Sequence, residues 1–166
     1  MWLRRGIEGA LVSVEPDLVQ GLPLVMFSGL PDAACRQAPD RIKASAANSD
    51  VPIPNRRLTV NLSPASIPKV GSGWALLIAI AVLAAADVFP AGVVDEIVHV
   101  GELGLDGPIR RSGGLPVALA AARLGRSQIV VPAGNAAEAA LVPGVCVVPA
   151  RHLRDLVLCY QAIGRG

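Results

Sequence analysis

The residue best placed to act as a catalytic nucleophile is Ser72, which lies in a Gly-Ser-Gly turn directly before a long apolar segment. A hydrolase nucleophile elbow requires the pattern GxSxG, but Val70 and Trp74 occupy the flanking glycine positions. A serine also needs a base to take its proton. The two histidines, His99 inside an apolar run and His152 at the start of an amphipathic segment, are in settings typical of packing and surface residues.

Two lysines, Lys43 and Lys69, are the remaining partners for a Ser-Lys dyad. Lys69 precedes Ser72 by three residues, and the glycine turn between them permits an approach without specifying it. An active serine peptidase that uses Ser72 is therefore one hypothesis. The other is that Ser72 caps the helix that follows it.

Phosphate and metal sites lack their usual patterns. The chain contains no GxxxxGK[ST] loop, so it has no Walker A motif. The Gly-Ser-Gly turn could hold an anion at a helix N-terminus, but ordinary capping turns look the same. The three cysteines and two histidines match no ligand spacing, and isolated cysteines are typical of reduced thiols in the cytosol. We expect no metal, no nucleotide and no cofactor in this chain.

Two arginine pairs are candidates for contacting the phosphates of DNA: Arg56 with Arg57, and Arg110 with Arg111. A net charge of +2 is too small to indicate nucleic-acid binding by itself. Aromatic residues, which would stack on bases, make up only 3% of the chain. Ordinary solvated arginine is the alternative interpretation of both pairs.

These candidates must be positioned by the elements around them. A chain of 166 residues with 52% apolar residues fits one α/β domain over residues 1–166. The patterns predict a mixed sheet. Predicted strands cover 8–16 and 22–28 as an N-terminal hairpin, 57–63, 96–103, 127–132 and 145–149, with a hairpin at 106–107. Predicted helices start near residue 29 with a kink at Pro39, and cover 74–86, 115–125, 136–141 and 151–161.

The apolar run 74–86 is the one segment of the sequence that we considered as a membrane span. It has thirteen residues and ends at Asp87, whereas a span needs roughly 20 apolar residues. A helix that is apolar on every side is buried on every side. No signal peptide is visible at the start of the chain. We therefore expect a buried helix in a cytoplasmic protein that has no membrane contact.

Five ordered blocks carry a family resemblance: SGLPDAA (28–34), DRIKASAANS (40–49), RRLTVNLSPASIPKVGS (56–72), GELGLDGPIRRSGGLPVALAA (101–121) and VVPAGNAAEAALVPG (130–144). Together they resemble the N-terminal domain of the Mg-chelatase-like AAA+ proteins known as the ComM or YifB family. The resemblance implies a Lon-protease-like fold. It also implies that full-length members add an AAA+ ATPase module, which uses ATP and Mg and is absent from this chain. It further implies that members, with sister subunits in a ring, work as ATP-driven DNA motors associated with DNA recombination in natural transformation.

The weaker resemblance to the Lon peptidase domain bears on catalysis. Aligned on the glycines, the Lon nucleophile falls on Gly73 and its lysine on Ala118, so the resemblance implies that neither half of the dyad is present. An aspartate usual in the closer family is replaced by Ala75. The expectation is a non-catalytic domain that serves assembly, partner contact or DNA handling. The alternatives are a peptidase that uses Ser72 and a module that binds nucleic acid through the two arginine pairs.

Overall fold

A computed structural model of the chain describes residues 2–3, 12–29, 32–51, 53–66 and 72–165. Seven strands form one sheet in the order β3-β4-β2-β1-β5-β8-β9, and two more form a separate hairpin. The sheet strands are β1 (Trp2–Leu3), β2 (Val12–Val19), β3 (Leu24–Ser28), β4 (Arg57–Ser63), β5 (Val98–His99), β8 (Gln128–Pro132) and β9 (Cys146–Ala150). The hairpin strands are β6 (Glu102–Leu103) and β7 (Ile109–Arg110).

Six α-helices and three 3-10 turns accompany the strands in the described residues. They are α1 (Ala33–Arg36), α2 (Ala38–Asn48), η1 (Ser72–Trp74), α3 (Ala75–Ala85), η2 (Ala91–Val93), α4 (Gly114–Arg123), η3 (Ala133–Asn135), α5 (Ala136–Ala139) and α6 (Leu153–Ile163). Strand β2 is antiparallel to β1 and β4, whereas β3–β4, β1–β5, β5–β8 and β8–β9 are parallel. The predicted α/β class with a mixed sheet is confirmed.

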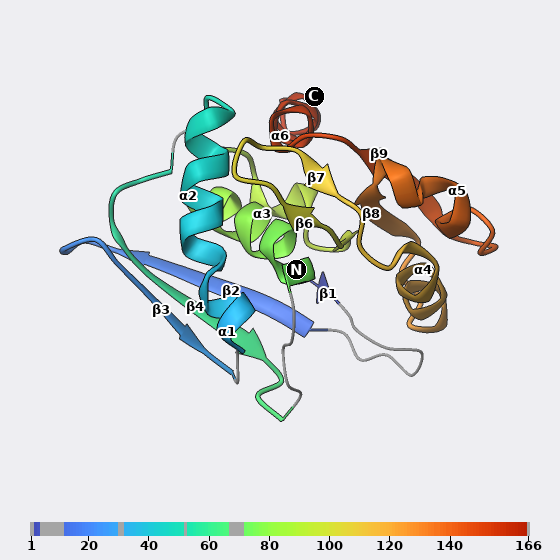
Figure 1. The fold of residues 1–166 in the computed structure, drawn as a ribbon, viewed down its shortest axis with the longest axis horizontal. Coiled ribbons are helices and arrows are strands. Elements are labelled where there is room, and N and C mark those ends of the chain that lie inside the picture. The colour runs from blue at the N-terminus through green and yellow to red at the C-terminus, as the bar shows by residue number, and fades with distance from the viewer. Residues whose placement is uncertain (1, 4–11, 30–31, 52, 67–71, 166) are drawn as a thin grey trace.

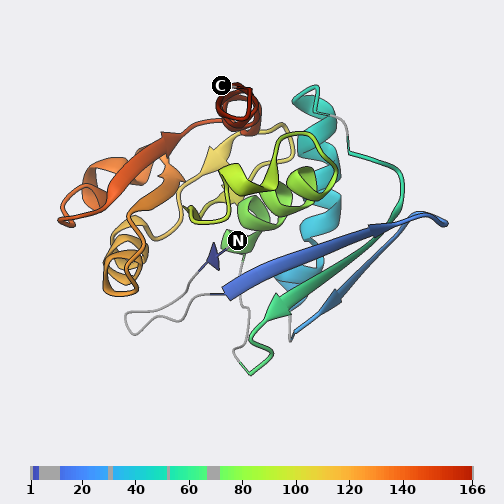
Figure 2. The same ribbon diagram turned by 180° about the vertical axis from the view of Figure 1, so that it is seen from behind.

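Helices cover one face of the first half of the sheet. Figures 1 and 2 show α1, α2 and α3 on the same side of the β2–β4–β3 strands, while α4 and α5 lie beside β8 and β9. Strand β4 follows the alternation of its sequence, because Leu58, Val60 and Leu62 are buried under the helices while Arg57 and Asn61 are exposed. The predicted strand 57–63 is therefore confirmed residue by residue.

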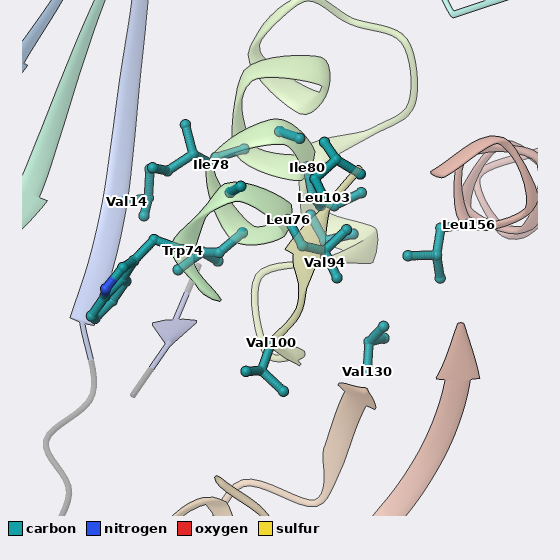
Figure 3. Close-up of a cluster of buried hydrophobic side chains, with 14 of the residues drawn as sticks. Val14, Trp74, Leu76, Ile78, Ile80, Val94, Val100, Leu103, Val130 and Leu156 are labelled. Atoms are coloured by element: carbon teal, nitrogen blue, oxygen red, sulfur yellow. The ribbon is translucent and has the colours of Figure 1, made fainter. Parts of the chain in front are cut away.

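The core is built around α3. All residues of this helix from 75 to 84 are buried, because β2, α2 and the β6–β7 hairpin pack around it. Figure 3 shows Leu76 and Ile80 of α3 among side chains of the surrounding elements, including Val94, Leu103 and Leu156. Burying each such aliphatic side chain stabilises the fold by about 1.5–3 kcal/mol. The prediction of a buried helix at 74–86 is confirmed.

Among the described residues, no helix combines the length and the apolarity that crossing a bilayer requires.

The prediction that strands 8–16 and 22–28 pair with each other in an N-terminal hairpin is wrong. Strands β2 and β3 follow each other in sequence, but β4 lies between them and pairs with both. The strand that forms an antiparallel pair at the N-terminus is β1, whose Trp2 and Leu3 align with Ser13 and Val12. Strand β4 enters between them as the parallel partner of β3, because the chain between these two strands contains α1 and α2, the crossover that a parallel pair requires.

The predicted strand 96–103 is also divided. Val98–His99 belongs to the large sheet and Glu102–Leu103 to the small hairpin. The chain bends at Gly101, where a Cβ atom would come within 2.8 Å of Ile109 and 3.1 Å of Leu76. The bend lets Gly101 accept a hydrogen bond from the Leu76 amide, which joins the start of α3 to both sheets.

Three predictions of turns and helix ends are confirmed. The Asp-Gly turn closes the β6–β7 hairpin, with Gly107 at a φ of 101° that favours glycine. The helix preceding Pro39 ends at Arg36, and Pro39 lies in the first turn of α2. Helix α4 ends before Gly125, whose φ is 71°.

Candidate functional site

The position that the Lon resemblance assigns to a nucleophile is Gly73, in the 3-10 turn before α3. Its carbonyl oxygen accepts a hydrogen bond from the Gly101 amide at 3.4 Å. A Cβ atom on Gly73 would lie 2.9 Å from the Ser112 hydroxyl oxygen, closer than Cβ atoms are found to other heavy atoms. Ser112 therefore occupies the space that a side chain at position 73 would need.

The backbone amides of Ser112 and Gly114 are held by two side chains, those of Asn135 at the N-cap of α5 and of Glu138 within α5. The Ser112 amide donates to Asn135 Oδ1 at 3.0 Å, and the Gly114 amide donates to Glu138 Oε1 at 3.2 Å. Asn135 Nδ2 also donates to Glu138 Oε1. This Asn135–Glu138 clamp gives the first turn of α4 a carboxylate partner, and a negative charge is favourable at a helix N-terminus.

The sequence spacing of Asn135 and Glu138 predicts a capping box for the helix in which they stand. That prediction is wrong, because the Asn135 side chain makes no cap hydrogen bond to α5. Gly114 explains the change of partner. A Cβ atom there would lie 2.6 Å from Asn135 Cβ and 2.8 Å from Glu138 Oε1, so the missing side chain lets α4 approach the clamp. Ser112 is the neighbour of this site that sequence reasoning missed.

The other residues considered for a catalytic dyad are Ala118, Ser72, Lys69 and Lys43. Ala118, where the resemblance places the lysine, is completely buried in α4. Ser72 begins η1, and Trp74 is the N-cap residue of α3, without a side-chain cap bond. The Ser72 side chain and the whole of Lys69 lie outside the described parts of the structure, so a dyad between them stays a prediction. Lys43 is exposed on α2.

His99 is completely buried and both of its ring nitrogens are engaged. Its Nδ1 lies 3.0 Å from the Ile97 carbonyl oxygen, which can only accept, so Nδ1 carries the proton and donates. Its Nε2 then accepts from the Tyr160 hydroxyl at 2.7 Å. Burial lowers the pKa of His99 to about 3, and burial also raises the pKa of Tyr160. His99 is a neutral link between β5 and α6.

His152 has a capping role. It is the N-cap residue of α6, and its Nδ1 accepts a hydrogen bond from the Arg154 amide at 3.2 Å. Its Nε2 therefore donates to the Asp106 carbonyl oxygen at 3.1 Å, which fastens the β6–β7 turn to α6. The interpretation of both histidines as structural residues agrees with these partners.

The structure separates the two arginine pairs. All four side chains are exposed, but Arg57 opens β4 while Arg110 lies on β7. Strands β4 and β7 are on opposite sides of α3 in Figure 1. The Arg111 side chain packs over Gly134, where a Cβ atom would lie 3.0 Å from its Cγ atom. DNA contact through these residues stays a prediction, and it would have to use two separate surfaces.

Comparison with known proteins shows which family the chain resembles. The family model of subunit ChlI of Mg-chelatase matches residues 14–135. An uncharacterized protein of Mycobacterium tuberculosis is 44% identical over 153 residues, which cover 92% of this chain and 30% of that protein. The competence protein ComM of Haemophilus influenzae is 36% identical over 152 residues, with 92% and 30% covered. The uncharacterized protein YifB of Escherichia coli is 37% identical over 150 residues, with 90% and 29% covered.

The chain belongs to the family of the Mg-chelatase subunit ChlI, and its relatives include proteins named ComM and YifB. The predicted family is confirmed. The chain spans about three tenths of the length of these curated relatives.

Proposed function

We propose that this chain is the non-catalytic N-terminal domain of a ComM-like AAA+ ATPase. It would serve assembly, partner contact or DNA handling beside an ATP-driven motor for DNA recombination in natural transformation. The motor module, with its ATP and Mg, would lie in the rest of the protein. Its partners would be that module and sister subunits in a cytoplasmic ring.

The observation that carries this proposal is that the match to ComM covers nearly all of this chain but only a small part of ComM. Nearly all of this chain aligns, at 36% identity, with only 30% of a protein named for competence. The chain itself contains no GxxxxGK[ST] loop. A motor that hydrolyses ATP therefore needs sequence that this chain does not contain.

The candidate site supports a role without catalysis. Gly73 and Ala118 carry neither a nucleophile nor a base, and the Ser112 hydroxyl fills the space beside Gly73. The two histidines use their ring nitrogens in hydrogen bonds that link secondary-structure elements. A general base must reach the proton that it removes, and a histidine buried like His99 cannot reach a substrate.

A chimera tests the proposed role. The segment of Haemophilus influenzae ComM that aligns with this chain is replaced by this chain, and transformation frequency is measured in a strain that lacks its own ComM. We expect the chimera to restore transformation. The matched control carries Leu76→Asp, which places a charge in the core and should abolish the rescue. A chimera that is produced in full and folded, yet gives no rescue, would overturn the proposal.

Peptidase activity is tested separately with a fluorogenic peptide. The parent chain and Ser72→Ala should give the same background rate, because the dyad positions hold Gly73 and Ala118. A parent rate that disappears in Ser72→Ala would show that the chain is a peptidase and that the non-catalytic role is wrong.

DNA contact is tested by salt titration of the affinity for duplex DNA. Replacing Arg56 and Arg57 by Ala should lower the slope of log affinity against log salt by about 0.9 for each phosphate that the variant no longer neutralises. The same change at Arg110 and Arg111 tests the second surface. A double Ala variant at Arg151 and Arg165, which are also exposed, is the control. An unchanged slope in both pair variants would exclude these four residues as DNA contacts.

A further inference from the structure

The central strand of the seven-stranded sheet is much shorter than its neighbour. Strand β1 has two residues, whereas β2 has eight. On one edge β2 pairs with β4 over its residues 13–19, but on the other edge it pairs with β1 only at Val12 and Ser13. Figures 1 and 2 show β1 beside the first residues of β2, with the rest of β2 extending past it. Among the described residues, no strand pairs with this edge of β2 from Val14 to Val19.

A hollow of about 210 Å³ lies beside this free edge. Strand β2, the second half of α3 and the segment around η2 supply its small, mostly apolar lining, which includes Val14, Pro16, Ala81, Ala84, Ala91 and Asp95. Figure 3 shows the Val14 side chain pointing from β2 toward α3. Strand β1 is antiparallel to β2 and aligns Trp2 with Ser13. The line of β1, continued past Trp2, therefore runs opposite Val14 to Pro16 along the hollow. We call the free edge and the hollow together the β2 slot.

The backbone of β2 can still form hydrogen bonds in this slot. An unpaired edge presents N–H and C=O groups that can pair with an added strand. Every second residue of a strand turns these groups to the same edge. Pro16 has no N–H, so it removes at most one donor from the slot, and its carbonyl oxygen can still accept. An extended peptide that adds to a sheet edge gains its affinity from such a backbone ladder.

The side chains of β2 alternate between the two faces of the sheet, and the two faces differ in chemistry. Val14, Pro16 and Leu18 turn toward α3 and are buried or half-buried. Glu15 and Asp17 turn to the other face and are exposed. Side chains directly opposite each other on paired strands lie on the same face and interact. A strand in the β2 slot would therefore place every second side chain against the hollow and the others opposite the two carboxylates.

We propose that the β2 slot binds an extended segment of a partner protein, antiparallel to β2, in which small apolar residues alternate with lysine or arginine. The apolar residues leave water against Ala81 and Ala84 of the hollow. The basic residues pair with Glu15 and Asp17 across the strands. Asp95, the charged residue that lines the hollow, is also acidic. An acidic or uncharged strand lacks these pairs, so the charge pattern selects among the strands that the edge could accept.

Binding in the slot does not depend on the proposed function. The slot is made by β2, α3 and η2 of this chain alone. It can bind such a segment whether or not the chain works beside an ATPase. A negative result with the peptides described next would therefore leave the outcome of the ComM chimera unaffected.

Isothermal titration calorimetry with synthetic peptides tests the slot. The probe is acetyl-Val-Lys-Val-Lys-Val-amide, whose lysines come opposite Glu15 and Asp17 when its valines come opposite Val14, Pro16 and Leu18. The first control is acetyl-Val-Glu-Val-Glu-Val-amide, which has the same alternation and the opposite charge. The second is acetyl-Val-Val-Lys-Lys-Val-amide, which has the same composition but always turns one lysine toward the hollow. Each control should bind at least about tenfold more weakly than the probe.

Reversal of the charges on β2 gives a second test. Glu15→Lys combined with Asp17→Lys should weaken binding of the lysine peptide at least about tenfold. The same variant should bind the glutamate peptide instead, because opposite charges then meet. Asp40→Lys combined with Asp155→Lys changes the net charge equally at exposed residues of α2 and α6, and it should leave both affinities unchanged.

Hydrogen exchange shows where the peptide binds. Backbone amides in Val12–Val19 should exchange more slowly when the lysine peptide is present. A lysine peptide that does not bind, or that binds without protecting β2, would overturn the proposal. So would equal affinity for the lysine peptide and either control, or binding that the charge reversal on β2 leaves unchanged.

Discussion

Acidification should destabilise the folded chain through His99. This side chain is completely buried, and its two ring nitrogens are bound to the Ile97 carbonyl and the Tyr160 hydroxyl. Protonation of Nε2 would replace an acceptor by a donor facing a hydroxyl and would place a charge in the core. Burial accordingly holds the folded-state pKa of His99 at about 3, below the unfolded value of 6.5.

The magnitude follows from proton linkage. Below pH 6.5 the unfolded state binds a proton that the folded state refuses, so the free energy of unfolding falls as the pH falls. Each pH unit in this window costs about 1.4 kcal/mol. The loss at pH 5 is therefore about 2 kcal/mol, and it reaches its limit of about 5 kcal/mol near pH 3. Domains of this size are stable by about 5–15 kcal/mol, so the effect is measurable.

Urea unfolding at pH 8, 6.5, 5 and 4 is the assay. The parent chain should lose stability across this series, and His99→Gln, which stays neutral, should lose about 2 kcal/mol less between pH 8 and pH 5. Tyr160→Phe removes the hydroxyl that donates to His99 and should cost about 1–3 kcal/mol at pH 8. His152→Gln serves as the matched control at the other histidine and should keep the dependence that belongs to His99.

The reasoning would be refuted if parent and His99→Gln lost the same free energy of unfolding between pH 8 and pH 5. Equal losses would mean that His99 does not titrate differently in the folded and unfolded states. A folded-state His99 whose ring signals in NMR titrate near pH 6.5 would contradict the same step directly.

Three further predictions concern packing and the clamp beside α4. Gly114→Ala should lower the free energy of unfolding in urea by about 1–3 kcal/mol, because its Cβ would overlap the α5 segment, while Gly92→Ala, which meets no neighbouring atom, should cost little. Glu138→Ala should speed exchange of the Gly114 amide about tenfold in hydrogen-exchange mass spectrometry, because that amide then has no carboxylate acceptor. Leu76→Ala should cost about 2–5 kcal/mol in the same urea assay, whereas exposed Leu141→Ala should change stability by less than about 0.5 kcal/mol.

Individual strands and helices were predictable where the apolar residues repeat in the sequence with the same period as the buried positions in the structure. Strand β4 alternates in sequence and in burial, and the last helix places Leu153, Leu156 and Val157 inward as its spacing predicts. The pairing of the strands was not predictable in the same way. Neighbouring strands β2 and β3 suggest a hairpin, but β4 enters between them after the helical crossover through α1 and α2. Which strands pair depends on contacts between segments that are separated in the chain, and a local sequence pattern does not contain that information.

The candidate site, too, was predictable from the sequence only in part. The sequence alone determines that positions 73 and 118 carry glycine and alanine, and hence that the dyad of the Lon resemblance is not present there. Only the tertiary structure decides that Ser112 fills the space beside Gly73 and that the Asn135–Glu138 pair serves α4 instead of its own helix. Residue identity excludes a chemistry directly, because a missing side chain cannot react. Hydrogen-bond partners depend on which segments pack together, and a spacing of three residues is compatible with either helix.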